Sequence, residues 1–344
     1  MTWERSIRAE QAFLGAVLLD PAGQHQLLDV VGPGDMYRPW HAQVLAAMYR
    51  ARARGAMPGP AEVYRELQDD PFLPRTVAAD AVPLASLMEA APRPGHAPAY
   101  ASMVVEGGIR RSVGLAGSRL VLACEGGDLA TAFRQTAEAR RELTACAGRW
   151  QSLPGRFGRE PARPDEPVGH QPGPAPQDDN AAAIGGRALR DLVAAPGRLA
   201  TVRTWLRSEH FARAADGKLY AVMQDMHAAL MPVDAVTVAW QAARRGIRAE
   251  PDSLTGGTGA FAVISCREVH RRGVLASIAQ SGRDLQARAS SPTSSPGLLM
   301  RQANDRLAAI ENAPRPDPAP ERAPGNLLPR RAVAASRPER EATP

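Results

Sequence analysis

The chain of 344 residues is long enough for two domains, and 44% of its residues are apolar although only 5% are aromatic. Alanine and leucine favour helices and strand-forming residues are few, so we expect an all-α fold. The net charge of +6 is carried almost entirely by arginine, because Lys218 is the one lysine. A phosphate-binding loop of the GxxxxGK[ST] type needs Ser or Thr after its lysine, whereas Leu219 follows Lys218. These 344 residues therefore exclude that loop.

The first 90 residues predict short helices that are separated by proline and glycine. The expected helices cover 8–19, 24–31, a segment from Pro39 to Gly55, a segment that begins at Pro60, and a turn or two near 84–90.

Two longer helices follow. The pattern predicts one helix from about Pro98 to Cys124 and, after a glycine turn, a second from Asp128 to about Arg149. Long helices joined by a tight turn form an antiparallel hairpin, which would complete a first domain over 1–151.

Residues 152–184 contain many prolines and almost no large apolar side chains, which predicts a disordered linker. A second helical domain is expected over 185–312. A tail rich in proline and arginine follows over 313–344, and we expect it to be disordered.

The second domain repeats the same kinds of element. We expect helices over 198–206, after an Asp216 cap, after an Asp234 cap, from the glycine cluster at 256–259 to about Ala289, and over 298–310.

The two halves resemble each other in sequence. Asp35-Met36-Tyr37 and the residues up to Tyr64 correspond to Glu209-His210-Phe211 and the residues up to Val238, at an offset of 174–175. Arg110-Arg111 matches Arg271-Arg272 at a shorter offset of 161, so the second copy would have lost about thirteen residues. Such a long spacing predicts a tandem duplication of a domain.

The segment from Ala9 to Pro21, AEQAFLGAVLLDP, is similar to the start of the N-terminal domain of DnaB-type replicative DNA helicases. The segment GDMYRPWH from Gly34 and the segment YASMVVE from Tyr100 resemble later parts of that domain, as does MPVDAVTV from Met231. The resemblance covers about 4–150 and, more weakly, 185–312.

This resemblance implies a collar domain that is not catalytic, pairs through its helical hairpin and offers a surface to primase. The helicase family continues into an ATPase domain, whereas a second N-terminal-like domain stands in its place here. The resemblance therefore implies a non-enzymatic scaffold, without cofactor or metal, that acts in or near DNA replication. The expected partners are the replicative helicase, primase or a copy of itself.

The predicted interaction surface has two parts. One is the hairpin stripe, and the other is the start of the third helix; their candidate residues are Tyr37, Trp40, His41, Val105, Ile109, Arg110, Arg111 and Val113. The apolar residues of the hairpin extend over more than one side of its helices. They either pack within their own domain or also cover the second hairpin, in an intramolecular pseudo-dimer or a homo-oligomer. A linker of about thirty residues would permit the intramolecular pseudo-dimer, in which the two hairpins meet at an effective concentration of roughly millimolar.

The sequence signals for metal, phosphate or nucleic-acid binding are weaker. His41 lacks partners at metal-ligand spacing, which favours a capping or partly buried histidine. Cys266 and His270 share a helix face, but two ligands do not make a zinc site. The glycine cluster at 256–259 follows no predicted strand, which favours a flexible segment before a helix over a phosphate-binding loop. For the paired arginines a solvated helix face is favoured over contact with nucleic acid or an acidic partner.

Two alternative functions remain open. One is a regulator that binds nucleic acid weakly through its arginines. The other is an accessory helicase subunit that works with a separate ATPase. The odd number of unpaired cysteines and the absence of a signal-like start or a long apolar run favour a cytoplasmic location without membrane contact.

Overall fold

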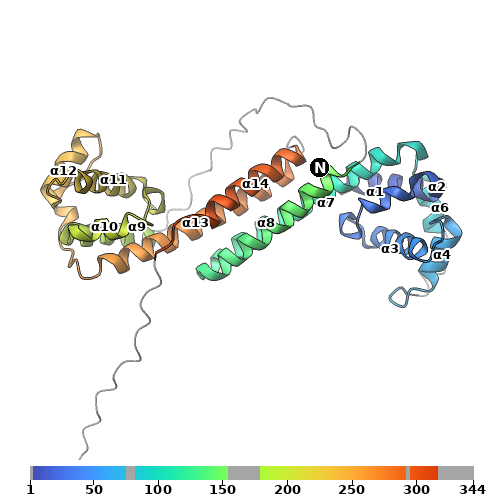
Figure 1. Ribbon diagram of the computed structural model, residues 1–344, viewed down its shortest axis with the longest axis horizontal. Coiled ribbons are helices and arrows are strands. Elements are labelled where there is room, and N and C mark those ends of the chain that lie inside the picture. The colour runs from blue at the N-terminus through green and yellow to red at the C-terminus, as the bar shows by residue number, and fades with distance from the viewer. Residues whose placement is uncertain (1–2, 75–81, 154–178, 292–294, 317–344) are drawn as a thin grey trace, which may run out of the picture.

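The computed structural model describes residues 3–74, 82–153, 179–291 and 295–316, and over these ranges it contains helices and no strands (Figure 1). The prediction of an all-α fold is confirmed. Two helical bundles lie at opposite ends of the molecule, and four long helices run between them (Figure 1).

The first bundle and first hairpin come from the N-terminal half. The first bundle contains α1 (Trp3–Leu19), α2 (Pro21–Gln24), η1 (His25–Asp29), η2 (Pro33–Asp35), α3 (Pro39–Ala53), α4 (Pro60–Gln68), α6 (Val82–Glu89) and η3 (Pro94–His96). The first hairpin consists of α7 (Ala97–Glu125) and α8 (Leu129–Gln151).

The second bundle and second hairpin repeat this order. The second bundle contains α9 (Asp179–Ala194), η5 (Pro196–Arg198), α10 (Leu199–Val202), η6 (Ser208–His210), α11 (Ala214–Ala228), α12 (Ala235–Arg244) and η7 (Pro251–Leu254). The second hairpin consists of α13 (Ala262–Ser290) and α14 (Pro296–Glu311).

Several predicted boundaries differ from the observed ones. Helix α9 begins at Asp179, inside the predicted linker 152–184. An alanine-rich stretch, in which helix propensity is highest, precedes the apolar stripe of Leu189, Leu192 and Val193. The predicted helix over 198–206 shrinks to α10, where threonine and valine lower the propensity. Asp216 lies within the first turn of α11 and does not cap it. Residues 154–178 of the predicted linker and 317–344 of the predicted tail lie outside the described residues.

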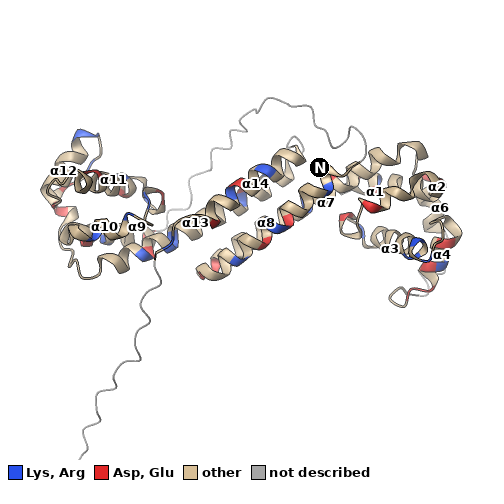
Figure 2. Cartoon of the chain, viewed as in Figure 1, with Lys and Arg blue, Asp and Glu red and all other residues tan. Residues whose placement is uncertain are grey.

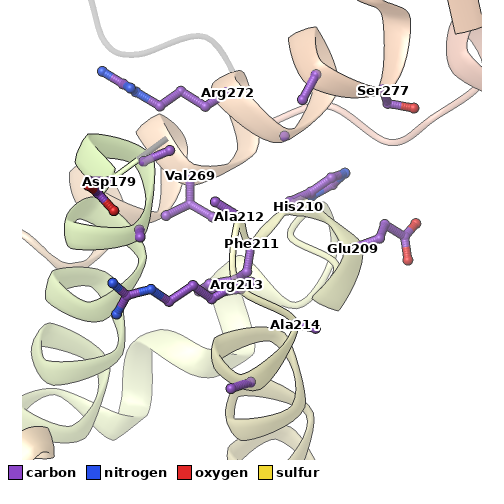
Figure 3. A pocket seen from close by; sticks show the side chains of 15 residues that line it. Asp179, Glu209, His210, Phe211, Ala212, Arg213, Ala214, Val269, Arg272 and Ser277 are labelled. Carbon is purple, nitrogen blue, oxygen red and sulfur yellow. The ribbon is translucent and has the colours of Figure 1, made fainter. Parts of the chain in front are cut away.

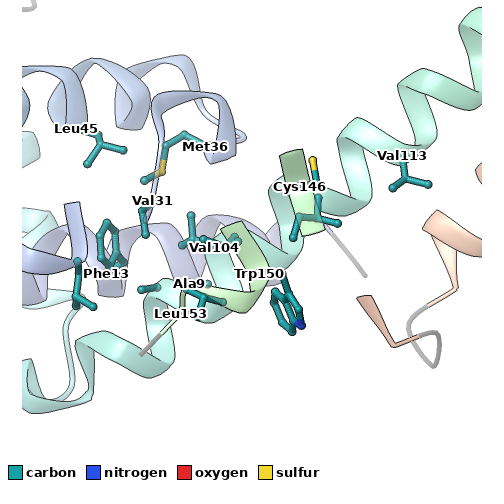
Figure 4. Close-up of a cluster of buried hydrophobic side chains, with 14 of the residues drawn as sticks. Ala9, Phe13, Val31, Met36, Leu45, Val104, Val113, Cys146, Trp150 and Leu153 are labelled. Atoms are coloured by element: carbon teal, nitrogen blue, oxygen red, sulfur yellow. The ribbon is translucent and has the colours of Figure 1, made fainter. Parts of the chain in front are cut away.

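The core of the first bundle forms where α1, α3 and α7 meet. Figure 4 shows Phe13, Leu45 and Val104 pointing into one cluster, which Trp150 of α8 also enters. Phe13 and Leu45 are fully buried. The hairpin is therefore continuous with the core of its own bundle.

Contacts in the two bundles correspond at a spacing of 175 residues. Arg50 and Asp70 form an ion pair of 3.0 Å in the first bundle. At the same two positions the second bundle has Asp225 and Arg245, which pair at 2.7 Å with the signs exchanged. An ion pair that survives an exchange of sign shows that the two helix pairs meet in the same way.

The hairpins repeat at a spacing of 165, and not at the predicted 161. Gly108 of α7 packs on Asp35, and Gly273 of α13 packs on His210 in the same way. The prediction was wrong by four residues, about one helical turn, because a slip of one turn keeps the same face of a helix. Arg271 therefore does not occupy the position of Arg110.

The two hairpins pack against each other within one chain. Helix α7 runs antiparallel to α13, and α8 packs against α14 (Figure 1). A Cβ atom on Gly117 would lie 2.5 Å from the backbone oxygen of Gly282, and one on Gly282 would lie 2.6 Å from the oxygen of Gly117. Apolar side chains on both sides of this crossing are buried, namely Val113, Leu120, Ile278 and Leu285. Of the two arrangements left open by the sequence, the structure has the one in which the hairpins cover each other.

This crossing gives a stability prediction. Gly117→Ala should lower the free energy of unfolding by about 1–3 kcal/mol, although alanine is the better helix former, because the new methyl group overlaps the backbone of α13. Chemical denaturation measures the change.

The matched control is Gly148→Ala on α8, where a new Cβ meets no heavy atom within 4 Å. That variant should gain about 0.5–1 kcal/mol. A shift of the same sign in both variants would contradict the close approach of the two backbones.

Candidate interaction surface

A groove of about 470 Å³ lies where η2, α7 and the end of α13 meet. Tyr37, Arg110 and Arg111 line it, together with Ala289 and Ser290 from the second hairpin. The structure thus brings together three of the residues predicted to form an interaction surface, and it adds residues from the other copy.

Arg111 fills the inner part of this region. Its guanidinium donates to the backbone oxygen of Asp35 and lies 5.8 Å from the centre of the Tyr37 ring. The Asp35 carboxylate accepts from Arg149 at 2.9 Å and from the Gly32 amide at 2.8 Å. Burial raises the pKa of Asp35, and these donors oppose that rise. Tyr37 is 48% exposed, so its outer face remains available for contact.

His41 lies away from the surface. It is buried, and its Nδ1 lies 2.7 Å from Oε2 of Glu10. Glu10 also accepts from the backbone amides of Tyr37 and Arg38. This buried pair fixes the turn before α3, whereas Trp40 is half-buried and packs on the first core.

The hairpin residues Val105, Ile109 and Val113 are fully buried. Arg110 is only 6% exposed and donates to the backbone oxygen of Ser291, which follows α13, at 2.6 Å. The interpretation of Arg110 as part of a solvated face was therefore wrong, because the opposite hairpin covers it.

Arg271 makes the reciprocal contact. It donates to the backbone oxygen of Gly127, in the turn after α7, also at 2.6 Å. Each hairpin thus supplies an arginine to the turn carbonyl of the other. The sequence singled out both arginines as recurrent, and the structure places both between the hairpins.

A larger cavity of about 680 Å³ lies in the second bundle, between α9, η6, α11 and α13 (Figure 3). Ala276 and Ala212 line it, and they stand at the positions of Arg111 and Tyr37 in the first copy. The large side chains that line the groove in the first copy thus correspond to methyl groups in the second. Sequence reasoning missed this cavity because the register of 161 concealed the exchange of Arg111 for Ala276.

His210 lies at the edge of this cavity (Figure 3). Its ring meets that of His270 edge to face, with ring centres 4.7 Å apart. Burial, with the neighbouring His270 and Arg207 acting in the same direction, lowers the pKa of His210 to about 4. Burial also lowers the pKa of His270. Both rings are therefore neutral near pH 7.

No group of three or more His, Cys, Asp or Glu side chains within the described ranges is arranged to hold a metal ion. Burial raises the pKa of the Cys266 thiol to about 12, so this sulfur stays protonated. None of the helices described is long and apolar enough to cross a lipid bilayer.

The lowered pKa of His210 predicts a dependence of stability on pH. Between pH 6.5 and about 4 the unfolded chain binds a proton at this histidine and the folded chain does not, so stability falls as the pH decreases through this window. His210→Asn, which keeps an acceptor for the Arg207 amide, should flatten the slope in urea titrations. His227→Asn on α11 is the control. An unchanged slope for His210→Asn would contradict the burial of a neutral ring.

Comparison with known proteins identifies the fold. The family model described as DnaB-like helicase N terminal domain matches residues 3–106 and 187–255, together about half of the chain. The two matched segments are consistent with a tandem arrangement.

Two individual proteins are similar over parts of the chain. The replicative DNA helicase DnaB of Geobacillus stearothermophilus is 35% identical over 107 residues, which is 31% of this chain and 23% of that protein. The chain thus spans about a quarter of the length of this curated relative. The crystal structure of the N-terminal domain of DnaB helicase from Mycobacterium tuberculosis has 31% sequence identity and a TM-score of 0.36, covering 38% of this chain and 94% of that one. By the extent of the family match, the chain belongs to the family of the DnaB-like helicase N-terminal domain.

Proposed function

We propose that this chain is a non-catalytic interaction protein that acts in or near DNA replication through a collar formed by its own two hairpins. Its partners in this proposal are the replicative helicase or primase. The working surface is the groove around Tyr37 and Arg111, next to the hairpin pair.

One observation carries the proposal: both halves of a hairpin-to-hairpin interface come from the same chain. Arg110 and Arg271 hold the turns of opposite hairpins, and the backbones touch at Gly117 and Gly282. A pair formed within one chain needs no second subunit to bury its apolar stripe. The chain would therefore present a complete collar unit as a monomer.

The charge distribution supports a protein partner over nucleic acid. Basic and acidic residues are interspersed along α8 and α14 and do not form a stripe of one sign (Figure 2). Several of the arginines are engaged in ion pairs, such as Arg119 with Glu142 and Arg140 with Glu311. A nucleic-acid surface would present clustered, accessible arginines along one face.

One of the matching relatives is a replicative DNA helicase, and this favours a second candidate function. In this second function, the chain is an accessory subunit that changes the rate of ATP hydrolysis by a separately encoded motor. Both functions use the same surface, and the effect on the motor's ATPase rate distinguishes them.

The proposal predicts that purified chain binds purified replicative helicase or primase from its own source. Tyr37→Ala should weaken this binding about tenfold, because a half-exposed aromatic side chain in a groove is typical of an interaction hot spot. Biolayer interferometry measures the affinity, and light scattering measures the mass of the free chain.

Leu122→Ala on α7 is the matched control, since Leu122 is 67% exposed but lies outside the groove. Absence of binding to both proteins would overturn the proposal, as would ATP hydrolysis by the chain alone. A changed ATPase rate of the bound helicase would select the accessory-subunit function.

A further inference from the structure

The second bundle carries a group of exposed apolar side chains around the start of α12. We name it the α12 surface, and it consists of Leu230, Met231, Val236 and Trp240, which are 93%, 40%, 67% and 68% exposed. Val236 and Trp240 are four residues apart and share one face of α12. Leu230 and Met231 lie in the turn that precedes this helix, at the end of the molecule far from the first bundle (Figure 1).

The first bundle has the same backbone without this surface. At the spacing of 175, Leu230 corresponds to Gly55, Val236 to Ala61 and Trp240 to Arg65. The backbone bonds agree: the amide of Gly55 donates to Arg52, and that of Leu230 donates to His227. A bundle of this shape therefore does not require large apolar side chains here.

The backbone at Leu230 strengthens this point. Leu230 has a φ of 56° and is the one residue other than glycine with a positive φ among those described, whereas Gly55 has a φ of 76°. Glycine adopts this left-handed conformation readily and leucine does so at a cost. A strained leucine that is almost fully exposed gains nothing from packing inside the chain. Residues of this kind are concentrated at binding sites.

The charges beside the surface also differ between the copies. Asp69 and Asp70 of the first bundle are replaced by Arg244 and Arg245. Arg244 lies two turns beyond Val236 and one turn beyond Trp240, on the same face, and it is exposed. Arg245 pairs with Asp225. The apolar face of α12 thus ends in positive charge.

We propose that the α12 surface binds an acidic amphipathic helix of a partner protein. The partner's apolar stripe would cover Trp240, Val236 and Leu230, and its carboxylates would lie against Arg244. The apolar face of such a helix complements the exposed apolar side chains, and its negative charge complements Arg244.

Other occupants fit less well. A second copy of the chain would bring the same arginine against itself, and like charges oppose that contact. Single-stranded nucleic acid needs aromatic platforms for successive bases, and three of the four apolar side chains here are aliphatic. The inference rests on the proposed role as an interaction protein, but it names a different surface and a different partner chemistry.

The test uses the full chain and a designed probe. The probe is a fluorescent helical peptide with leucine on one face and glutamate on the other, and the control peptide carries lysine in place of glutamate. Fluorescence anisotropy should show saturable binding of the acidic peptide and at least about tenfold weaker binding of the basic one.

The variants replace residues by those that the first copy holds at the same positions. Trp240→Arg and Leu230→Gly should each weaken binding of the acidic peptide about tenfold, since a central exposed aromatic and its neighbour carry most of the contact. Leu230→Gly should at the same time raise the melting temperature, because it relieves the positive φ. Arg65→Trp in the first bundle should not increase binding, since Asp69 and Asp70 lie beside it.

Equal binding by wild type and Trp240→Arg would overturn the inference, as would failure of the acidic peptide to bind. Trp240-dependent binding of single-stranded DNA, or a dimer that Trp240→Arg dissociates, would overturn it in favour of those occupants. These outcomes are separate from the proposed function, because the α12 variants leave the Tyr37 groove and its helicase or primase binding intact.

Discussion

The contact between the backbones of Gly117 and Gly282 is the constraint on which the rest of the structure depends. A Cβ atom added to either glycine would lie within 2.6 Å of a backbone oxygen of the opposite helix. Helices α7 and α13 can therefore meet at this distance only because both positions lack a side chain. The close crossing lets Val113 and Leu120 of one hairpin share a core with Ile278 and Leu285 of the other. It also brings each hairpin turn within reach of an arginine from the opposite hairpin. Because the crossing lies between the bundles, it holds them at opposite ends of the molecule.

Pairing within one chain changes what the hairpins can do. Two separate subunits lose translational and rotational freedom when they associate, whereas tethered hairpins meet at an effective concentration on the order of millimolar. The apolar stripe of each hairpin is then covered without dependence on protein concentration. In the function proposed above, the surfaces left for partners are the groove beside Tyr37, which residues of both hairpins line, and the outer ends of the bundles. Contact with a partner is thereby separated from assembly of the chain itself.

Sequence patterns predicted the helices well because prolines and glycines mark their ends, as Pro39, Pro60 and the Gly126-Gly127 turn do. The hairpin register was predicted wrongly, because residues four apart on a helix share a face and the paired arginines fitted the wrong turn. His41 was expected to be a capping or partly buried residue of the interaction surface, whereas it is fully buried. Its partner Glu10 was not predicted, since thirty-one residues separate them. Tyr37 and Arg111 were chosen from separate segments, and only the fold shows that they touch. The cavity beside His210 was missed because the wrong register hid that Ala212 and Ala276 stand at the positions of Tyr37 and Arg111.

The two copies agree at core positions and differ at a buried polar pair and at the α12 surface. Core positions are retained, as Met48 and Val63 correspond to Met223 and Val238, all fully buried. The buried pair of Glu10 and His41, by contrast, becomes Gly185 and Asp216, and Oδ2 of Asp216 has no hydrogen-bond partner within the described part of the chain. Burial raises the pKa of Asp216, so the second bundle carries a polar cost that the first avoids. The second copy also differs at the α12 surface, where leucine, valine and tryptophan stand at the positions of Gly55, Ala61 and Arg65 and Arg244 stands at the position of Asp69. An exposed apolar surface on the second bundle and an arginine-lined groove beside the first are expected if the two copies of the fold serve two different contacts.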